Sequence, residues 1–196
     1  MAKARVLFSN KGYGKTSIKD IARACGCEAS NIYNYFVSKE SLLYEILREE
    51  MDWLVSSIQD LEADDITSPV EALRLLVNNH VKLTLSYRRL SRLLFDDELR
   101  SLLPAHRKEI IAYRDHYDRI LRKIIRRGIN AGDFAEVDEK LIGYSIASMI
   151  VRTRVWFRPR GRLSTKEIAD IIFKFILNGL RSDRSLQNQT TSPNMI

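Results

Sequence analysis

The stretch FSNKGYGKTSIKDIARACGCEASNIYNYFVSKESLL, residues 8 to 43, decides the fold of this chain. Gly12 can adopt the left-handed conformation that ends a helix. Thr16 and Ser17 offer side-chain oxygens to the free N–H groups at the start of the next helix. The stretch therefore predicts one helix that ends near Gly12 and another that begins after Ser17.

Apolar or small residues recur at helical spacing from Ile18 to Cys25, and Gly26 then interrupts the pattern. A second short helix is expected from Ser30 to Tyr35. Two short helices joined at a glycine have the layout of a helix-turn-helix, in which the second helix enters the major groove of DNA.

We expect the helix from Glu28 to Tyr35 to enter the groove, because its side chains are of the hydrogen-bonding kind that reads base edges. The candidates for base contacts are Ser30, Asn31 and Asn34. The candidates for phosphate contacts are Thr16, Ser17, Tyr33, Tyr35 and Lys39. Lys39 lies in the first turn of the next helix, where the dipole opposes a cation unless an anion such as phosphate lies in front of it.

The run GYGKTSIKDIARACGCEASNIYNYFVSKESLL resembles the DNA-binding domain of TetR-family transcriptional regulators. The family pattern has a Gly-aromatic corner, a Thr-Ser capped helix, Ile-Ala, Ala-Gly-Val, Tyr-x-Tyr-Phe and Ser-Lys-Glu-x-Leu. The resemblance implies an all-α homodimer with about nine helices per subunit. An N-terminal three-helix helix-turn-helix domain would precede a C-terminal helical ligand-binding and dimerisation domain. The motif covers the first quarter of the chain, and the rest agrees in layout. Repression is the common activity in the family.

The sequence departs from the family pattern at three points. It starts at Met1, only a few residues before Leu7, so we expect a short first helix and a reduced basic arm. Glu28 and Ala29 stand where the family often has a capping Ser and a Lys, which removes one expected contact. Glu28 also brings an anion near the DNA.

Length and charge agree with a DNA-binding unit plus a larger domain. The chain has 196 residues, of which 45% are hydrophobic, enough for a core. We expect domains at 1–44 and 45–181, followed by a disordered tail at 182–196. The net charge of +7 favours a polyanionic partner. Residues 1–50 contribute only eight basic against six acidic side chains, because most of the arginine excess lies later in the chain.

The residues give no support for catalysis, and no enzyme, cofactor or metal site is expected. The histidines His80, His106 and His116 have no neighbours in the sequence that would complete a catalytic group. We expect His116 on a solvated helix face. The two cysteines, Cys25 and Cys27, lack the further ligands of a zinc site and are interpreted as small core fillers. The alternative, a redox sensor, requires an exposed thiolate with a resolving partner.

Helical signals continue to the end of the domain. Ser68-Pro69, Asp138 and the Ser164-x-x-Glu167 box each predict a helix start, and Asn130-Ala131-Gly132 predicts a helix end. The expected helices cover residues 38–62, 69–87, 88–95, 104–131, 141–156 and 165–180. The acids Asp96, Asp97 and Glu98 are expected to be solvated rather than a metal site.

Residues 141–150 are apolar or small on nearly every side, so this helix must be covered all round. With the Ile-rich last helix it can form a four-helix bundle across a two-fold axis. The alternative is an ordinary monomer core. No apolar run reaches the length that spans a bilayer and no signal peptide heads the chain, so we expect a cytoplasmic protein without membrane association.

An effector pocket would need apolar and aromatic surface with a few polar tips. The candidate lining residues are Leu83, Tyr87, Phe95, Tyr113, Tyr117, Met149, Trp156 and Arg158. The segment Trp156 to Arg162 resembles, more loosely, one in relatives that respond to fatty acyl-CoA, where arginines could meet the CoA phosphates. A solvated basic turn is the alternative. A helical protein-interaction module without an effector is the rival function, and salt-independent partner binding would favour it.

Overall fold

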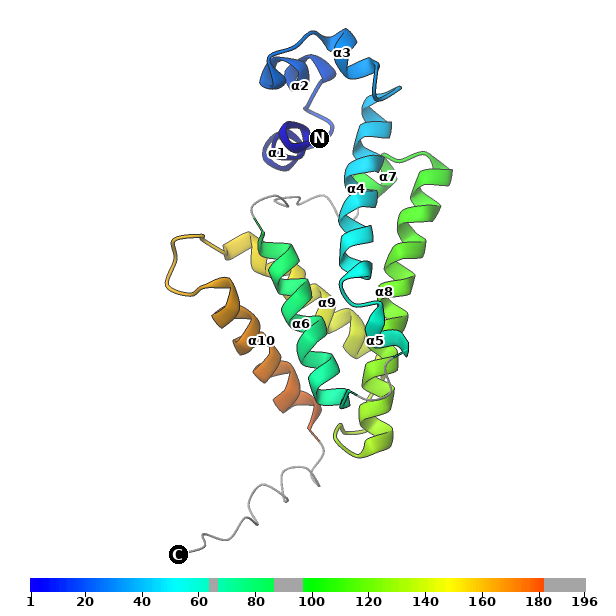
Figure 1. The fold of residues 1–196 in the computed structure, drawn as a ribbon, viewed down its shortest axis with the longest axis vertical. Coiled ribbons are helices and arrows are strands. Elements are labelled where there is room, and N and C mark those ends of the chain that lie inside the picture. The colour runs from blue at the N-terminus through cyan, green and yellow to red at the C-terminus, as the bar shows by residue number, and fades with distance from the viewer. Residues whose placement is uncertain (64–66, 87–96, 182–196) are drawn as a thin grey trace, which may run out of the picture. The chain divides into compact units, whose positions relative to one another are not determined.

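The computed structural model describes residues 1–63, 67–86 and 97–181, and helices account for nearly all of its regular structure (Figure 1). Within these ranges the one β interaction is an isolated bridge between Phe134 and Arg181. The predicted all-α fold is confirmed. The helices are α1 (Ala2–Lys11), α2 (Ile18–Cys25), α3 (Ala29–Tyr33), α4 (Lys39–Ser56), α5 (Asp60–Ala63), α6 (Pro69–Leu85), α7 (Asp97–Arg100), α8 (Pro104–Ala131), α9 (Glu139–Trp156) and α10 (Thr165–Leu180).

The chain packs into two compact units. The first combines Met1–Trp53 with Ser86–Asp115, and the second combines Leu54–Leu85 with His116–Ile196. The helix-turn-helix therefore packs together with a segment that is distant in sequence, which the motif alone did not predict. The predicted domain boundary between residues 44 and 45 stays a prediction.

The predicted helix boundaries of the motif are confirmed where side chains cap them. The Ser17 hydroxyl accepts a hydrogen bond from the Asp20 N–H at 3.1 Å, and the Asp20 carboxylate accepts one from the Ser17 N–H at 3.0 Å. This reciprocal pair is a capping box. Gly12 and Gly26 follow α1 and α2 with φ of 82° and 70°, conformations that L side chains rarely adopt.

The helix predicted from residue 38 to 62 is interrupted, so that prediction was wrong. The carbonyl of Ser57 accepts a hydrogen bond from Asn79 Nδ2 at 2.7 Å. Leu61 N–H, its partner in an unbroken helix, donates instead to the Ile58 carbonyl at 3.0 Å. Because a side chain of α6 occupies this carbonyl, α4 ends before Ser57 and α5 begins after it.

In the second unit α6 packs against both α9 and α10 (Figure 1). The predicted caps of this unit are confirmed. Asp138 accepts from the Leu141 N–H at 2.9 Å, and Ser164 forms a capping box with Glu167. α8 ends at Gly132, which has φ 77°. Its last turn is covered by Phe134, whose ring would lie 2.1 Å from a Cβ on Gly128, so only glycine fits there.

Some predictions fall outside the described residues. These are the helix at 88–95, the tail at 182–196, the pocket candidates Tyr87 and Phe95, and the acid Asp96. Among the helices of the described ranges, none combines the length and the hydropathy that crossing a bilayer requires.

Candidate DNA interface

The head, defined as α1, α2, α3 and the first turn of α4, leaves the polar side chains of α3 exposed, while Ala29 and Ile32 are half-buried. No residue of α3 is buried. Its α-helix ends at Tyr33, earlier than the predicted Tyr35, although Phe36 N–H still donates to the Ile32 carbonyl at 3.0 Å. Six of the eight candidate contact residues are exposed, namely Ser17, Ser30, Asn31, Tyr33, Asn34 and Tyr35. Tyr35 is 82% exposed, so a DNA duplex can contact its side chain.

Thr16 and Lys39 hold the corner between α1 and α2. The Thr16 side chain is 1% exposed and its hydroxyl donates to the Gly12 carbonyl at 2.9 Å. That corrects the prediction of a phosphate contact by this side chain. The Lys39 ammonium donates to the carbonyls of Tyr13 and Thr16, at 3.0 Å each, and lies 4.2 Å from the Tyr13 ring centroid. Two of its three N–H donors are thus bound within the head.

The turn between α2 and α3 is a Schellman motif. Cys27 N–H donates to the Ala22 carbonyl at 3.1 Å and Gly26 N–H to the Arg23 carbonyl at 3.2 Å. Cys27, the residue after the left-handed glycine, is half-buried, whereas Cys25 at the helix end is exposed. The interpretation of Cys25 as a core filler was therefore wrong. Its spacing matches Ile18 and Ala22, but the helix ends before any neighbour covers it.

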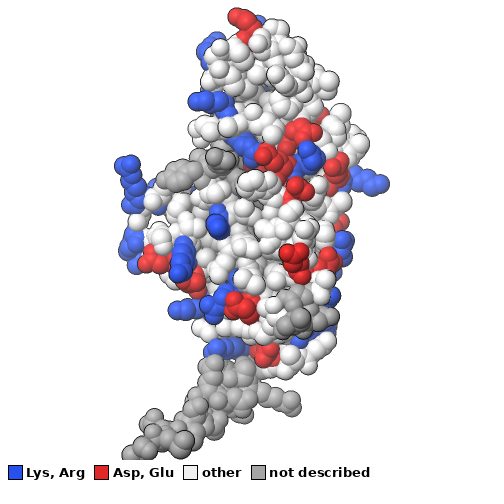
Figure 2. Space-filling view, viewed as in Figure 1, with Lys and Arg blue, Asp and Glu red and all other residues white. Residues whose placement is uncertain are grey.

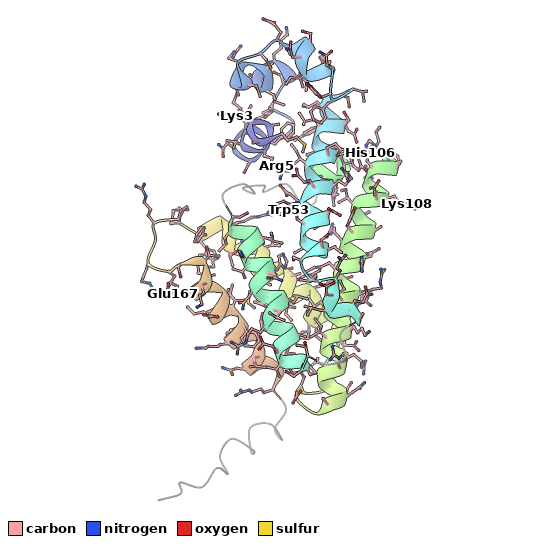
Figure 3. All side chains as sticks on the ribbon, in the orientation of Figure 1. Lys3, Arg5, Trp53, His106, Lys108 and Glu167 are labelled. Carbon is pink, nitrogen blue, oxygen red and sulfur yellow. The ribbon has the colours of Figure 1, made fainter. Side chains whose placement is uncertain are left out.

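A buried ion pair fastens α1 to α4. The Arg5 guanidinium, which is 8% exposed, binds the Glu50 carboxylate at 2.9 Å and also the Glu49 carboxylate. Figure 3 labels Arg5 on α1. Sequence reasoning missed this pair. The available signal was an arginine flanked by Ala4 and Phe8 at core positions of an otherwise apolar helix face. The position of α1 therefore depends on charge pairing as well as on apolar contact.

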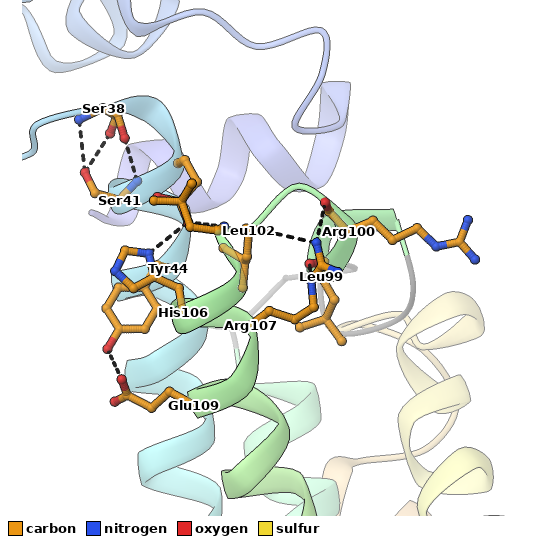
Figure 4. A network of polar contacts seen from close by, with 11 residues as sticks. Ser38, Ser41, Tyr44, Leu99, Arg100, Leu102, His106, Arg107 and Glu109 are labelled. Carbon is orange, nitrogen blue, oxygen red and sulfur yellow. Dashed lines mark hydrogen bonds and ion pairs between the residues drawn. The ribbon is translucent and has the colours of Figure 1, made fainter.

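A polar network joins the start of α8 to the first turns of α4, within the first unit (Figure 4). Glu40 Oε1 accepts from Leu103 N–H at 2.9 Å and lies 2.9 Å from His106 Nδ1. The Tyr44 ring stacks on His106 with centroids 3.9 Å apart, and its hydroxyl donates to Glu109 at 2.7 Å. Burial and the Glu109 bond raise the pKa of Tyr44 to about 12. The sequence analysis did not predict this network, which fastens the start of α8 to α4.

The visible face of the molecule carries charges of both signs. On the face shown in Figure 2, basic and acidic side chains are interspersed. The small basic excess counted in residues 1–50 agrees with this picture.

The predicted pocket residues divide between the units. Tyr113 belongs to the first unit, and the other described candidates belong to the second. Of these, Tyr117 is buried, Leu83 and Met149 are half-buried, and Trp156 and Arg158 are exposed. The Tyr117 hydroxyl lies 2.7 Å from His80 Nδ1, so this tyrosine is bound to a buried histidine that sequence reasoning had left without a partner.

His80 makes the stability of the protein depend on pH. Burial, with a smaller contribution from the Arg154 cation, lowers the pKa of His80 from 6.5 to about 3. Between these two pH values His80 is protonated in the unfolded chain but neutral in the folded chain. The contribution of His80 to the free energy of unfolding is therefore level above pH 6.5 and falls as the pH drops toward 3. From pH 7 to pH 5 the expected loss is about 2 kcal/mol.

Urea denaturation of the parent and His80→Asn at several pH values measures this loss. The asparagine can keep a hydrogen bond to Tyr117 but does not titrate, so the gap between the two curves should narrow on acidification. If the free energies of unfolding of the two proteins changed with pH in parallel, the assignment of this pH dependence to His80 would be wrong.

The remaining titratable groups show no catalytic grouping within the described residues. His116 was expected on a solvated face, but it is half-buried and lies 2.8 Å from the Glu62 carboxylate, which corrects that expectation. This contact lowers the pKa of Glu62. Within residues 1–63, 67–86 and 97–181, no three His, Cys, Asp or Glu side chains are grouped so as to hold a metal ion.

Two family patterns match this sequence. Residues 1–46 match the family described as "Bacterial regulatory proteins, tetR family". Residues 67–180 match the family described as "Tetracyclin repressor-like, C-terminal domain". Together they span the helix-turn-helix and most of the helices that follow it.

Two transcription-regulator relatives are similar in sequence over most of the chain. The HTH-type transcriptional repressor KstR2 of Mycolicibacterium smegmatis is 26% identical over 179 residues, 90% of this chain and 86% of the relative. The fatty acid metabolism regulator protein of Bacillus subtilis is 23% identical over 178 residues, 90% and 91% of the two chains.

Solved structures show the same architecture. The TetR family transcriptional regulator PfmR from Thermus thermophilus superposes with a TM-score of 0.80 at 35% identity, covering 92% of this chain and 98% of that one. AibR in complex with isovaleryl coenzyme A and operator DNA superposes with a TM-score of 0.78 at 27% identity, covering 89% and 94%. With both domains matched and the helix-turn-helix in place, the chain belongs to the TetR family of DNA-binding transcriptional regulators.

Proposed function

We propose that this protein is a cytoplasmic repressor that binds a palindromic operator as a dimer and releases it on binding an effector. The observation that carries the proposal is the exposed polar surface of α3. The head that bears α3 is held in shape by the capping box of α2 and by the bonds of Lys39 to the turn before it. Side chains that serve only packing would be covered. Those of α3 are presented on a helix that fits a major groove.

The roles on DNA follow from exposure and chemistry. Ser30, Asn31 and Asn34 are proposed to contact base edges, because amide and hydroxyl groups pair with their donors and acceptors. Phosphates are proposed to be held by Tyr33, Tyr35 and the remaining N–H of Lys39. The Ser17 N–H and hydroxyl both donate to the Asp20 carboxylate, at 3.0 and 2.9 Å, so a phosphate contact by Ser17 would compete with the capping box. Glu28 is exposed at the N-cap of α3 without a capping side-chain bond, so its carboxylate stays near the DNA as an unfavourable charge.

The operator test starts from random DNA. Selection with the full chain should enrich a two-fold symmetric site, and its affinity should fall steeply with salt, by a log–log slope of about 0.9 per phosphate neutralised. A chain that enriches no site, but retains a protein partner at all salt concentrations, would support the protein-interaction module instead.

Replacing Asn31 by alanine should relax the preferred base at one position of each half-site. A lost bidentate contact removes about 1–3 kcal/mol of discrimination at that position. Repeating the selection with the variant measures this effect. Tyr35→Phe is the matched control, because loss of a phosphate contact should weaken all sites alike. An unchanged preferred sequence in Asn31→Ala would remove Asn31 from the base-reading set.

The dimer is proposed to form through the outer faces of α9 and α10. Large apolar side chains on these helices are exposed in the single chain, and exposed patches of this kind mark association surfaces. They are Leu141, Tyr144, Val155 and Trp156 on α9 and Ile171 and Phe175 on α10. A two-fold pairing of these helices covers both apolar stripes, and a palindromic operator has the same two-fold symmetry.

The proposed effector is an acyl-coenzyme A thioester. Arg158, Arg160 and Arg162 follow Trp156 in the loop before α10, where exposed guanidinium groups such as that of Arg158 are available to phosphates. Support comes from the similar AibR, solved with isovaleryl coenzyme A, and from the fatty acid metabolism regulator protein.

Calorimetric titration tests the effector. Isovaleryl-CoA or a long-chain acyl-CoA should give saturable heat and should release the selected operator. Coenzyme A alone and the free acid are the controls, since neither carries both the phosphates and the acyl chain. If none of the thioesters gives saturable heat or operator release, the effector proposal is wrong while the DNA-binding proposal stands.

A further inference from the structure

We propose that Cys25 and Cys27 form a peroxide-sensitive thiol pair in the turn of the helix-turn-helix, and that their oxidation to a disulfide lowers operator affinity. They are the only cysteines of the 196-residue chain, and both are free. The family pattern Ala-Gly-Val reads Cys-Gly-Cys here, so the chain places one thiol on each side of the glycine in the turn, and the Cys25 thiol is not covered by packing.

The two thiols differ in exposure, which suits one to react with the peroxide and the other to form the disulfide afterwards. Cys25 is exposed and can be reached by a small oxidant, whereas Cys27 is half-buried beside it. Apart from residues 25 to 27 themselves, no atom lies within 4 Å of the position where a Cβ on Gly26 would stand, so the surface above the turn is open. An accessible thiol with a neighbouring resolving thiol is the arrangement of a redox-sensitive site.

The backbone of the turn brings the two residues within bridging range. Gly26 has φ 70° and ψ 34°, the mirror image of a helical residue. Helical dihedrals at a residue set its two neighbouring Cα atoms about 5.4 Å apart, whichever the hand. That separation lies inside the range of about 4.4–6.8 Å over which disulfides form.

The reaction balances with one hydroperoxide per pair. The Cys25 thiolate attacks the peroxide oxygen, which breaks the O–O bond, gives a sulfenic acid and releases water after proton uptake. The Cys27 sulfur then displaces the hydroxyl from the sulfenic acid, forms the S–S bond and releases a second water. Two thiols are oxidised by two electrons, and the peroxide is reduced to two water molecules.

Closure of the bridge must move the turn. Side chains two residues apart on a helical backbone do not face each other, so the peptide planes on either side of Gly26 have to rotate, which glycine permits. The rotation strains the Cys27 N–H bond to the Ala22 carbonyl that sets the angle between α2 and α3. The disulfide therefore displaces α3 from the orientation in which the reduced head reads DNA.

The experiment uses the full chain, reduced or treated with hydrogen peroxide. Intact mass should fall by two hydrogen atoms per subunit, and peptide mapping should join Cys25 to Cys27. Affinity for the selected operator should fall by about tenfold or more, the scale of a lost base contact, and dithiothreitol should restore it. Cys25→Ser, Cys27→Ser and the double variant should bind the operator whether or not peroxide is present.

Distinct outcomes would overturn the proposal. These are oxygen addition without a disulfide, a disulfide between subunits, an intact affinity after bridging, or an equal peroxide effect in the double serine variant. The affinity measurement rests on the proposed function, but the mass measurement does not. Failure of the reduced protein to bind DNA would therefore count against the proposed function, whereas failure to form the bridge would count against the thiol pair alone.

Discussion

Replacing Arg5 by alanine should lower the free energy of unfolding by about 3 kcal/mol or more. The substitution removes a guanidinium from beside the Glu50 carboxylate, which is 4% exposed and cannot recover its hydration while the head stays folded. The Glu49 carboxylate, bound by the same guanidinium, adds repulsion once the cation is gone. Urea denaturation at pH 7, followed by circular dichroism, measures the loss.

Two control variants separate charge burial from simple truncation. Arg48→Ala removes an exposed pair with Glu45 on the same helix, and should cost no more than about 0.5 kcal/mol. Arg5→Met combined with Glu50→Leu should regain much of the stability, because apolar residues of similar volume replace a buried pair well. A loss for Arg5→Ala no larger than that for Arg48→Ala would show that the pair contributes little.

Replacing Phe175 by arginine should convert the protein to monomers and reduce operator affinity by about 10²–10⁴-fold. Phe175 is 67% exposed on α10, beside Ile171, which is also exposed, so the proposed interface would receive a charge at its apolar stripe. Each head of a monomer would then bind a half-site alone, without the effective concentration that a joined second head supplies. Sedimentation velocity and operator titration measure the two effects.

Leu75→Arg is the matched control for Phe175→Arg. Leu75 is an exposed apolar residue of α6, so the same change of charge is made outside the α9 and α10 stripe. That variant should remain dimeric and bind the operator normally. If Phe175→Arg also stays dimeric, the two-fold surface must lie elsewhere. A monomer that still binds the full operator tightly would argue against the two-headed mechanism.

The parts of the fold that sequence alone predicted are those set by local chemistry. Ser17 with Asp20, Ser164 with Glu167, and the glycine at position 26 act through hydrogen bonds and dihedral angles within a few residues of each other. Such signals survive in any tertiary context, so the helix starts and the turn were found. The same locality explains why the motif led to the family that the whole chain matches.

Only the tertiary structure decided where the chain's distant residues meet. The carbonyl that interrupts α4 is occupied by Asn79, and Glu40 is bound to residues at the start of α8. Cys25 has the spacing of a core residue yet is exposed, because periodicity describes a helix face and not what covers it. The helix caps and the DNA-reading motif follow from neighbours along the chain, whereas the interruption of α4 does not. The ion pair, the polar network and the open thiol depended on the packing of remote segments, which no local pattern encodes.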